Sequence, residues 1–382
     1  MRGNPLIYFD TAATSQKPQV VIDALCDFYA HHYATVHRAI YESSLHATQL
    51  YDKTRKKAAE YLNATDEEII FVKGTTEGIN LVAFSYGELL KPGDEILITV
   101  MEHHSNIVPW QLLCDRKNLT LKVLPINGNA ELELDKLDQL LTEKTKLVSV
   151  AHMANSTGTI NPIEKIIEKA HAAGAVVLID GAQSAAHMAV DVKKLDCDFY
   201  TFSSHKMYGP NGLGILYGKK ELLEQMPPYQ GGGDMIEKVS FAKTTFLPPP
   251  LKFEAGTTQI AEIIAFEKAL DYILNLGREN IFDYETTLLD HATDQMKKLD
   301  KITIIGTAKH KGPVISFVAK GMHALDLGTM LDLEGIAIRT GHHCAQPTLD
   351  FFNVPALARV SFGIYNTKEE VDQFIEVLKT LI

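Results

Sequence analysis

Short apolar runs alternate with amphipathic stretches between about residues 65 and 220. Apolar runs of this length are typical of buried strands, and the stretch 163–171 has the apolar spacing of a helix. Strands that alternate with helices predict an α/β domain with a mainly parallel sheet and helices on both faces. The expected strands lie at residues 69–72, 95–100, 147–151, 175–179 and 197–202.

The pattern changes after residue 226. Clusters of Pro and Gly at 227–233 and 248–250 flank a segment without periodicity, which predicts a long loop. Helical patterns follow at 259–277 and 280–299. A smaller α+β unit is expected after them, with strands near 302–305, 313–319, 335–339 and 357–362.

Length and composition are those of a globular protein with two domains. The chain has 382 residues, of which 46% are hydrophobic and 22% are charged. We expect a large domain over residues 16–256 and a small domain formed by residues 1–15 and 257–382.

Charge, apolar run length and cysteine usage argue against several classes of protein. The formal charge is −11 and no basic stripe occurs, which argues against a nucleic-acid partner. The N-terminus lacks the apolar segment of a signal peptide, and no apolar run approaches the roughly 18 residues of a membrane span. Four scattered cysteines form no disulfide framework. We therefore expect a cytoplasmic protein without membrane segments.

Lys206 follows the apolar run 197–202 and precedes a turn rich in Gly, Pro and Asn. Burial favours the neutral form of a lysine, and a neutral amine can form a Schiff base with an aldehyde. Asp180 ends the strand 175–179, where an acid can pair with the pyridinium nitrogen of pyridoxal phosphate. The pair predicts a pyridoxal-phosphate site, whereas a lone lysine would more simply be a solvated loop residue.

A Gly-Thr-Thr turn at 74–76 follows a strand and opens a helix. Backbone N–H groups, hydroxyls and the helix dipole at such a turn can bind a phosphate. Ser203 and His205, beside Lys206, are placed to reach the same phosphate. The alternative is that a threonine simply caps the helix.

Adjacent histidines, His103 and His104, follow the strand 95–100. One ring is expected to stack on a flat cofactor. Chelation of a metal, or a solvated loop, is the alternative, but neighbouring side chains usually diverge.

Cys344 lies in a loop rich in Gly and His, in which His342, His343 and Arg339 favour the nucleophilic thiolate. A zinc site made of three consecutive residues is a poor alternative, because they cannot easily supply a tetrahedral shell. The other cysteines, Cys26, Cys114 and Cys197, lie in apolar patterns and are expected in the core.

Arg359 stands inside an apolar strand, so its side chain is expected to be buried with an anionic partner. A planar guanidinium suits a substrate carboxylate in bidentate contact. An internal salt bridge is the alternative.

With these residues in place, the chain resembles the class V aminotransferase family of pyridoxal-phosphate enzymes. It is most similar to the group II, Suf-type cysteine desulfurases and selenocysteine lyases. The resemblance runs nearly end to end and rests on the segments 8–13, 71–78, 101–110, 180–183, 201–212, 253–257 and 339–347. It implies fold type I, with a large mainly parallel sheet domain and a smaller α+β domain.

The resemblance also implies roles for individual residues. Lys206 would hold pyridoxal 5′-phosphate, Asp180 would pair with its ring nitrogen, Gln183 would bond its phenolic oxygen and His103 would stack on its ring. The implied phosphate ligands are Thr75, Thr76, Ser203 and His205, with Gly256 and Thr257 from the other subunit of a homodimer. The implied substrate pocket holds Ala13, His37, Arg38, Asn155, Arg339 and Arg359, with Cys344 as sulfur acceptor.

The implied reaction converts L-cysteine to L-alanine and leaves a persulfide on Cys344, for transfer to a sulfur-acceptor protein of iron–sulfur cluster assembly. Lys206 would act as general base. Selenocysteine lyase, sulfinate lyase and aminotransferase activities on the same fold are alternatives, as are an idle assembly scaffold and a zinc hydrolase that uses the histidines.

Two replacements and the N-terminus depart from the family pattern. Ser204 replaces a glycine before the His-Lys pair, and Thr258-Gln259 replaces a common Pro-Asn. We expect both to tune loop geometry without loss of activity. The chain begins almost at the first strand, where relatives carry a helix, so we expect either a misplaced start or a more exposed dimer edge.

Overall fold

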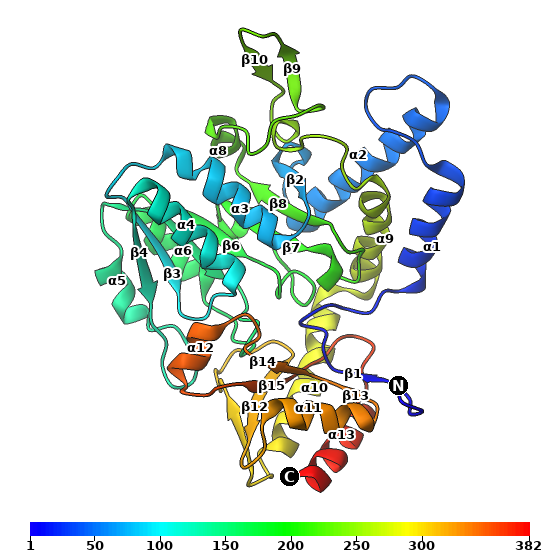
Figure 1. The fold of residues 1–382 in the computed structure, drawn as a ribbon, viewed down its shortest axis with the longest axis vertical. Helices are drawn as coiled ribbons and strands as arrows, with labels where there is room; N and C mark the ends of the chain where they lie inside the picture. Colours follow the sequence, from blue (N-terminus) through cyan, green and yellow to red (C-terminus); the bar gives the residue numbers. More distant parts are fainter.

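A seven-stranded mixed sheet forms the centre of the larger part of the molecule in the computed structural model, which describes residues 1–382 (Figure 1). The strand order is β2-β8-β7-β6-β5-β3-β4. Strands β3 to β7 run parallel, and β8 lies antiparallel to β7 and β2. The strands are β2 (Ile69–Val72), β3 (Glu95–Thr99), β4 (Thr120–Leu124), β5 (Thr145–Ala151), β6 (Val176–Asp180), β7 (Phe199–Ser203) and β8 (Gly214–Gly218).

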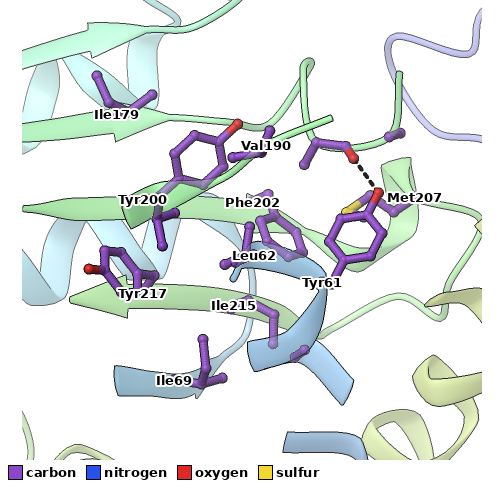
Figure 2. Close-up of a cluster of buried hydrophobic side chains, with 14 of the residues drawn as sticks. Tyr61, Leu62, Ile69, Ile179, Val190, Tyr200, Phe202, Met207, Ile215 and Tyr217 are labelled. Atoms are coloured by element: carbon purple, nitrogen blue, oxygen red, sulfur yellow. Dashed lines mark hydrogen bonds between the residues drawn. The ribbon is translucent and has the colours of Figure 1, made fainter. Parts of the chain in front are cut away.

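Apolar side chains project from both faces of this sheet. Helices therefore cover both faces, as the sequence predicted. One face packs on α2 and α9, and Figure 2 shows Tyr200, Phe202 and Tyr61 of α2 in the same apolar cluster. The hydroxyl of Tyr61 donates to the carbonyl oxygen of Ala185 at 2.6 Å, which satisfies its polar end inside the core. The other face packs on α3 and α4, where Trp110 is fully buried.

The helices of this larger part differ widely in length. They are α1 (Gln19–Asp27), α2 (Glu42–Leu62), α3 (Thr75–Ser85), α4 (Val108–Lys117), α5 (Leu137–Leu140), α6 (Ile163–Ala172), α7 (Val192–Leu195), α8 (Lys220–Gln225) and α9 (Ile260–Leu276). A π-helical turn, Phe28–His32, continues α1.

A second, smaller core surrounds an antiparallel sheet of order β11-β12-β15-β14, and both chain termini lie beside it (Figure 1). The first strand, β1, pairs with β13 in parallel. The strands are β1 (Ile7–Tyr8), β11 (Ile302–Ile305), β12 (Val314–Ala319), β13 (Ile336–Ala337), β14 (Arg339–Gly341) and β15 (Leu357–Ser361). The helices are α10 (Arg278–Met296), α11 (Ala324–Leu333), α12 (Gln346–Phe351) and α13 (Lys368–Leu381).

One expected loop contains a hairpin. Strands β9 (Ile236–Val239) and β10 (Thr244–Phe246) pair antiparallel and extend away from the body of the molecule (Figure 1). The loop prediction was wrong here because the hairpin buries almost none of its side chains, so its sequence lacks the alternation of a half-buried strand.

The boundary between the two parts stays a prediction. The apolar face of α9 joins the core of the large sheet, whereas Leu288 to Met296 of α10 joins the smaller core. No helix of the chain combines the length and apolar character needed to cross a membrane.

Candidate active site

A cavity of about 270 Å³ opens where β5, β6 and β7 end at their carboxyl termini. Ligands bind at this edge of parallel α/β sheets, because the connecting loops and helix N-termini meet there. Most residues singled out from the sequence line this cavity: Ala13, Thr75, Thr76, His103, Asn155, Asp180, Gln183, Ser203, His205, Lys206, Arg339, Cys344 and Arg359.

Lys206 reaches the cavity from a 3-10 turn, Ser204–Lys206, directly after β7. Burial lowers the pKa of its amine to about 8, the Asp180 carboxylate opposes that shift, and Arg359 adds to it. A fraction of the amine is therefore neutral near pH 8, as a Schiff base with an aldehyde requires.

Asp180 ends β6 and is 4% exposed. Burial raises the pKa of its carboxyl, while the N–H of Ala182, donated to Oδ1 at 2.9 Å, and the charge of Lys206 lower it. A buried carboxylate with one backbone donor is suited to receive a cationic N–H from a ligand.

The N-terminus of α3 forms a polar cradle beside Ser203. The backbone N–H of Thr75 donates to Oγ of Ser203 at 2.8 Å, and the two hydroxyls lie 2.9 Å apart. The residue before the helix is Gly74, whose φ of 156° and close approach to Ser203 leave little room for a side chain. No side chain caps this helix, so the alternative of a simple threonine cap is not what the structure contains.

His103 is held by its own loop. Its Nδ1 lies 2.8 Å from the hydroxyl of Ser105 and accepts the N–H of Ser105 at 3.1 Å. Burial lowers the pKa of the ring to about 4, and the charge of Lys206 adds to this, so the imidazole is neutral. A neutral ring can lie against an aromatic cofactor without the desolvation cost of a cation.

A buried polar network supports this loop from below. Glu102 accepts from Thr99 at 2.6 Å, from the side-chain amide of Asn106 at 2.6 Å and from the N–H of Ala151 at 3.1 Å. Asn106 in turn accepts the indole N–H of Trp110 at 2.9 Å. These three donors hold the Glu102 carboxyl group in place, and they thereby fix the residue just before His103.

Arg359 and Asn155 form the polar wall opposite. Arg359 is 3% exposed, and its Nη1 donates to the backbone oxygen of Asn155 at 3.0 Å. Two buried polar atoms here have no partner, Nε of Arg359 and Oδ1 of Asn155. Unpaired buried polar groups are rare in folded proteins, so these atoms mark a place for a polar ligand.

Cys344 lies between β14 and α12 and is exposed, as expected. Both Cys344, at φ 53°, and His343, at φ 52°, occupy the left-handed region. The loop is fixed at two points. The N–H of His104 donates to the Cys344 carbonyl oxygen at 2.7 Å, and the Asn155 amide donates to the His343 carbonyl oxygen at 2.6 Å.

Four predicted site residues lie outside the main cavity in the structure. His37, Arg38, Gly256 and Thr257 line a second cavity, of about 220 Å³, that shares no lining residue with the first. Gly256 and Thr257 were expected to act on the other subunit, whereas His37 and Arg38 were expected in the pocket itself. Within one chain, the structure does not bring these four residues to Lys206.

Several residues at the site were missed from the sequence. Asp10 binds Arg359, and Glu102 supports the His103 loop. The one available signal was the position of Glu102 directly before His103.

His104 and His343 were named from the sequence: His104 holds the Cys344 loop and His343 lines the cavity. The expectation that His343 favours the Cys344 thiolate was wrong, because burial lowers the pKa of its ring to about 3 and leaves it neutral.

One cysteine was assigned wrongly. Cys26 is exposed, because it lies on the outer face of α1, while Cys114 and Cys197 are buried as predicted. No group of three or more His, Cys, Asp or Glu side chains is arranged to hold a metal ion.

The residues present fit pyridoxal phosphate. The cavity combines an amine with a lowered pKa, a buried carboxylate, a neutral imidazole and a hydroxyl-lined helix N-terminus. The amide of Gln183 donates one N–H to the carbonyl oxygen of Ala12 at 2.7 Å, which leaves its second N–H for a ligand.

Comparison with known proteins finds relatives over the whole length of the chain. A cysteine desulfurase of Serratia proteamaculans is 50% identical over 384 aligned residues, which cover 100% of this chain and 94% of the relative. The apo structure of the cysteine desulfurase of Thermococcus onnurineus superimposes with a TM-score of 0.96 at 37% identity, over 99% of this chain and 94% of that one. The cysteine desulfurase CsdA of Escherichia coli, in an S-sulfonic acid form, gives a TM-score of 0.92 at 39% identity, over 98% of this chain and 94% of that one.

The family comparison covers almost the whole chain. Residues 7–374 match the family described as Aminotransferase class-V. The family recognised from the sequence and the predicted fold class are both confirmed. The chain belongs to the class V aminotransferase family.

Proposed function

We propose that this protein is a pyridoxal-phosphate-dependent cysteine desulfurase that converts L-cysteine to L-alanine and carries the sulfur as a persulfide on Cys344. One observation carries the proposal: Lys206, Asp180, Arg359 and Cys344 line the same cavity. An aminotransferase has no use for an exposed cysteine at that position. The names of the relatives, at about half identity over full length, support the same activity.

The cofactor site is assigned as follows. Lys206 would bind the aldehyde carbon, and Asp180 would pair with the ring nitrogen. Gln183 would donate to the phenolic oxygen, and His103 would lie against the ring. Thr75, Thr76, Ser203 and His205 would bind the phosphate. Burial lowers the pKa of His205 to about 4, so it contributes a neutral N–H donor.

Pyridoxal phosphate, when bound, supplies a conjugated ring that accepts the electron pair left on the substrate Cα. The residues of the chain transfer the proton and align the substrate. Lys206, with a pKa near 8, removes the Cα proton as a neutral amine and returns a proton later. Arg359 offers the substrate carboxylate its buried Nε–H, which has no partner in the chain. Asn155 offers the second N–H of its side-chain amide, because the first donates to the carbonyl oxygen of His343. Ala13 and Arg339 complete the wall of the pocket.

Cys344 performs the sulfur transfer. Its thiolate attacks the substrate sulfur, an S–S bond forms, and the Cβ–S bond of cysteine breaks. The electron pair left on Cβ takes up a proton, which gives L-alanine. The balance is L-cysteine plus the Cys344 thiol to L-alanine plus the Cys344 persulfide, with no outside oxidant. Selenocysteine can enter by the same route.

The second cavity supports a homodimer. His37, Arg38, Gly256 and Thr257 are polar or small residues gathered at one opening without access to the chain's own Lys206. In a symmetric dimer, each chain would lend these residues to its partner's phosphate and substrate pocket. Mixed dimers would show this: Lys206→Ala and Thr257→Val chains, each inactive alone, should regain activity together.

A sulfur-acceptor protein of iron–sulfur cluster assembly is proposed as the next partner, because a persulfide on an exposed residue must be passed on. Location in the cytoplasm is proposed because persulfide chemistry needs reduced thiols.

The test is direct. Purified protein loaded with pyridoxal phosphate should produce L-alanine from L-cysteine, and mass spectrometry should find one added sulfur atom on Cys344. Absence of alanine formation from both cysteine and selenocysteine, in protein with bound cofactor, would overturn the proposal.

A further inference from the structure

Four hydrogen-bond donors from the segment Thr14 to Lys17 converge on a single backbone oxygen beside Lys206. The carbonyl oxygen of His205 lies 3.1 Å from the backbone nitrogen of Ser15, 3.1 Å from its hydroxyl and 3.1 Å from the hydroxyl of Thr14. Nζ of Lys17 lies closer, at 2.7 Å. A carbonyl oxygen has two lone pairs, so this one is saturated. It belongs to the peptide bond that joins His205 to Lys206.

Lys17 provides the strongest of these contacts, because its donor is charged and nearest. Its ammonium group also donates to the carbonyl oxygen of Ser15 at 2.7 Å. Burial alone lowers its pKa to about 8, and no acidic group offsets the shift. A lysine normally keeps its ammonium in water, whereas this one is half-buried and donates to two backbone oxygens.

The same segment holds the chain beyond the turn. The N–H of Tyr208 donates to the hydroxyl of Ser15 at 2.8 Å, and Nδ1 of His205 lies 3.2 Å from the hydroxyl of Thr14. The N-terminal segment therefore fixes the backbone on both sides of Lys206, from His205 to Tyr208.

Lys17 does not line the main cavity. It lines a separate cavity of about 370 Å³, together with Tyr8, Tyr208 and Tyr365. Any influence of Lys17 on the chemistry must therefore pass through the backbone that it binds.

We propose that Lys17 is a positioning residue for Lys206. Its ammonium group fixes the peptide bond before Lys206 and thereby sets the direction from which the Lys206 amine enters the cavity. The inference rests on the proposed function, since it concerns the lysine assigned there to the cofactor.

The test measures how fast Lys206 reacts, separately from how well the pocket binds. In Lys17→Met, the side chain keeps its length and loses its donors and charge. The full chain, freed of cofactor, is mixed with pyridoxal 5′-phosphate, and the bond to Lys206 is trapped with borohydride and counted by mass spectrometry. Loss of a charge-assisted hydrogen bond predicts a rate lower by about tenfold or more.

Binding of pyridoxine 5′-phosphate distinguishes a positioning role from a purely structural one, because general damage to the pocket would raise its dissociation constant. This analogue has an alcohol in place of the aldehyde and cannot react with a lysine. Its dissociation constant should stay within about twofold in Lys17→Met, because fast non-covalent binding uses the unchanged phosphate and ring contacts. Lys17→Arg, which keeps the charge and the donors, should recover most of the rate.

The chain offers a matched control in Lys252. This buried lysine also donates to two backbone oxygens, those of Leu223 at 2.7 Å and Glu224 at 3.1 Å, but it lies outside both cavities lined by the proposed site residues. Lys252→Met should react at the parental rate.

The outcomes separate the inference from the proposed function. A parental rate in Lys17→Met, an equal slowing in Lys252→Met, or an equal loss of pyridoxine 5′-phosphate binding would each overturn the inference. If Lys17→Met does not fold, Lys17→Gln keeps neutral N–H donors and loses the charge, and a parental rate in that variant overturns the inference as well. A parent protein that never bonds the cofactor at Lys206 would instead overturn the proposed function.

Discussion

Arg359 donates from Nη2 to Oδ1 of Asp10 at 3.0 Å, and this ion pair orients the guanidinium at the wall of the cavity. Both readings of Arg359 from the sequence, an internal salt bridge and a substrate ligand, are compatible with this geometry. Asp10 and the backbone of Asn155 occupy Nη2 and Nη1, while Nε stays without a partner. The internal pair therefore leaves a free N–H donor for a ligand.

Substitution of Arg359 by lysine should weaken cysteine binding more than it slows the chemistry. A lysine keeps one charge but cannot present the planar fork that satisfies Asp10 and a substrate carboxylate together. Loss of one charge-assisted contact predicts a KM for L-cysteine higher by about 10- to 100-fold, with kcat within about threefold. Steady-state alanine formation measures both constants. An unchanged KM would show that the carboxylate binds elsewhere.

Substitution of Lys206 by alanine should abolish both covalent retention of pyridoxal phosphate and alanine formation. The parent should show a pH dependence with a defined sign: because the folded pKa of Lys206 is lowered to about 8, its neutral fraction rises as pH increases through 8. Covalent uptake should therefore accelerate from pH 7 to about pH 9 and then level off. Borohydride trapping over this range measures it.

Lys311 is the matched control for that experiment. Burial likewise lowers the pKa of its amine to about 8, but it donates to the carbonyl oxygen of Gly306, away from the cavity. Lys311→Met should keep the cofactor and its pH dependence. Cofactor lost equally from both variants would mean that the attachment at Lys206 is assigned wrongly.

Substitution of Cys344 by serine should remove sulfur transfer and leave the cofactor bound. A hydroxyl is a poor nucleophile toward sulfur, so alanine formation from cysteine should fall by at least about 100-fold. The other exposed cysteine, Cys26, serves as control, and Cys26→Ser should keep the parental rate. Persulfide found on Cys26 instead of Cys344 would contradict the assignment.

Much of the fold follows from local sequence pattern. The parallel strands of the large sheet are buried on both faces and read as unbroken apolar runs, so the expected positions of β2, β5 and β6 agree with the structure to within two residues. Lys206 and Asp180 could be paired in advance because Asp180 ends one strand, Lys206 follows the next, and parallel strands end at one edge of the sheet. The exposed hairpin β9–β10 has no such pattern and was missed.

Contacts between distant parts of the chain could not be predicted from the sequence. Asp10 and Arg359 are 349 residues apart, and they meet because a β-bridge joins Asp10 to Ser361 at the end of β15. The assignment of Cys26 to the core failed for a different reason: a helical pattern shows that one face is apolar, but α1 leaves part of its surface exposed. Periodicity cannot identify which face the rest of the fold will cover.

The buried ion pair between Arg55 and Glu254 should be essential for stability. Two parallel hydrogen bonds of 2.8 Å join them, and Glu254 also accepts the N–H of Phe71 at 2.8 Å. Arg55→Met would leave that carboxylate buried without its cation, a change that typically costs about 3–5 kcal/mol. Chemical denaturation of protein with equal cofactor content measures the loss as a lower midpoint.

The position of Glu254 adds a second effect to this prediction. Glu254 lies two residues before Gly256, so a displaced carboxylate should also disturb the second cavity, which it lines together with Thr257. If a partner chain receives these residues at its phosphate site, Arg55→Met should weaken cofactor binding as well as stability. Lys379→Ala, which breaks an exposed pair with Glu376, should lower stability by less than about 1 kcal/mol and leave the cofactor unaffected. If Arg55→Met lowers stability but leaves cofactor affinity unchanged, the Arg55–Glu254 pair stabilises the core of its own chain and does not contribute to the partner's phosphate site.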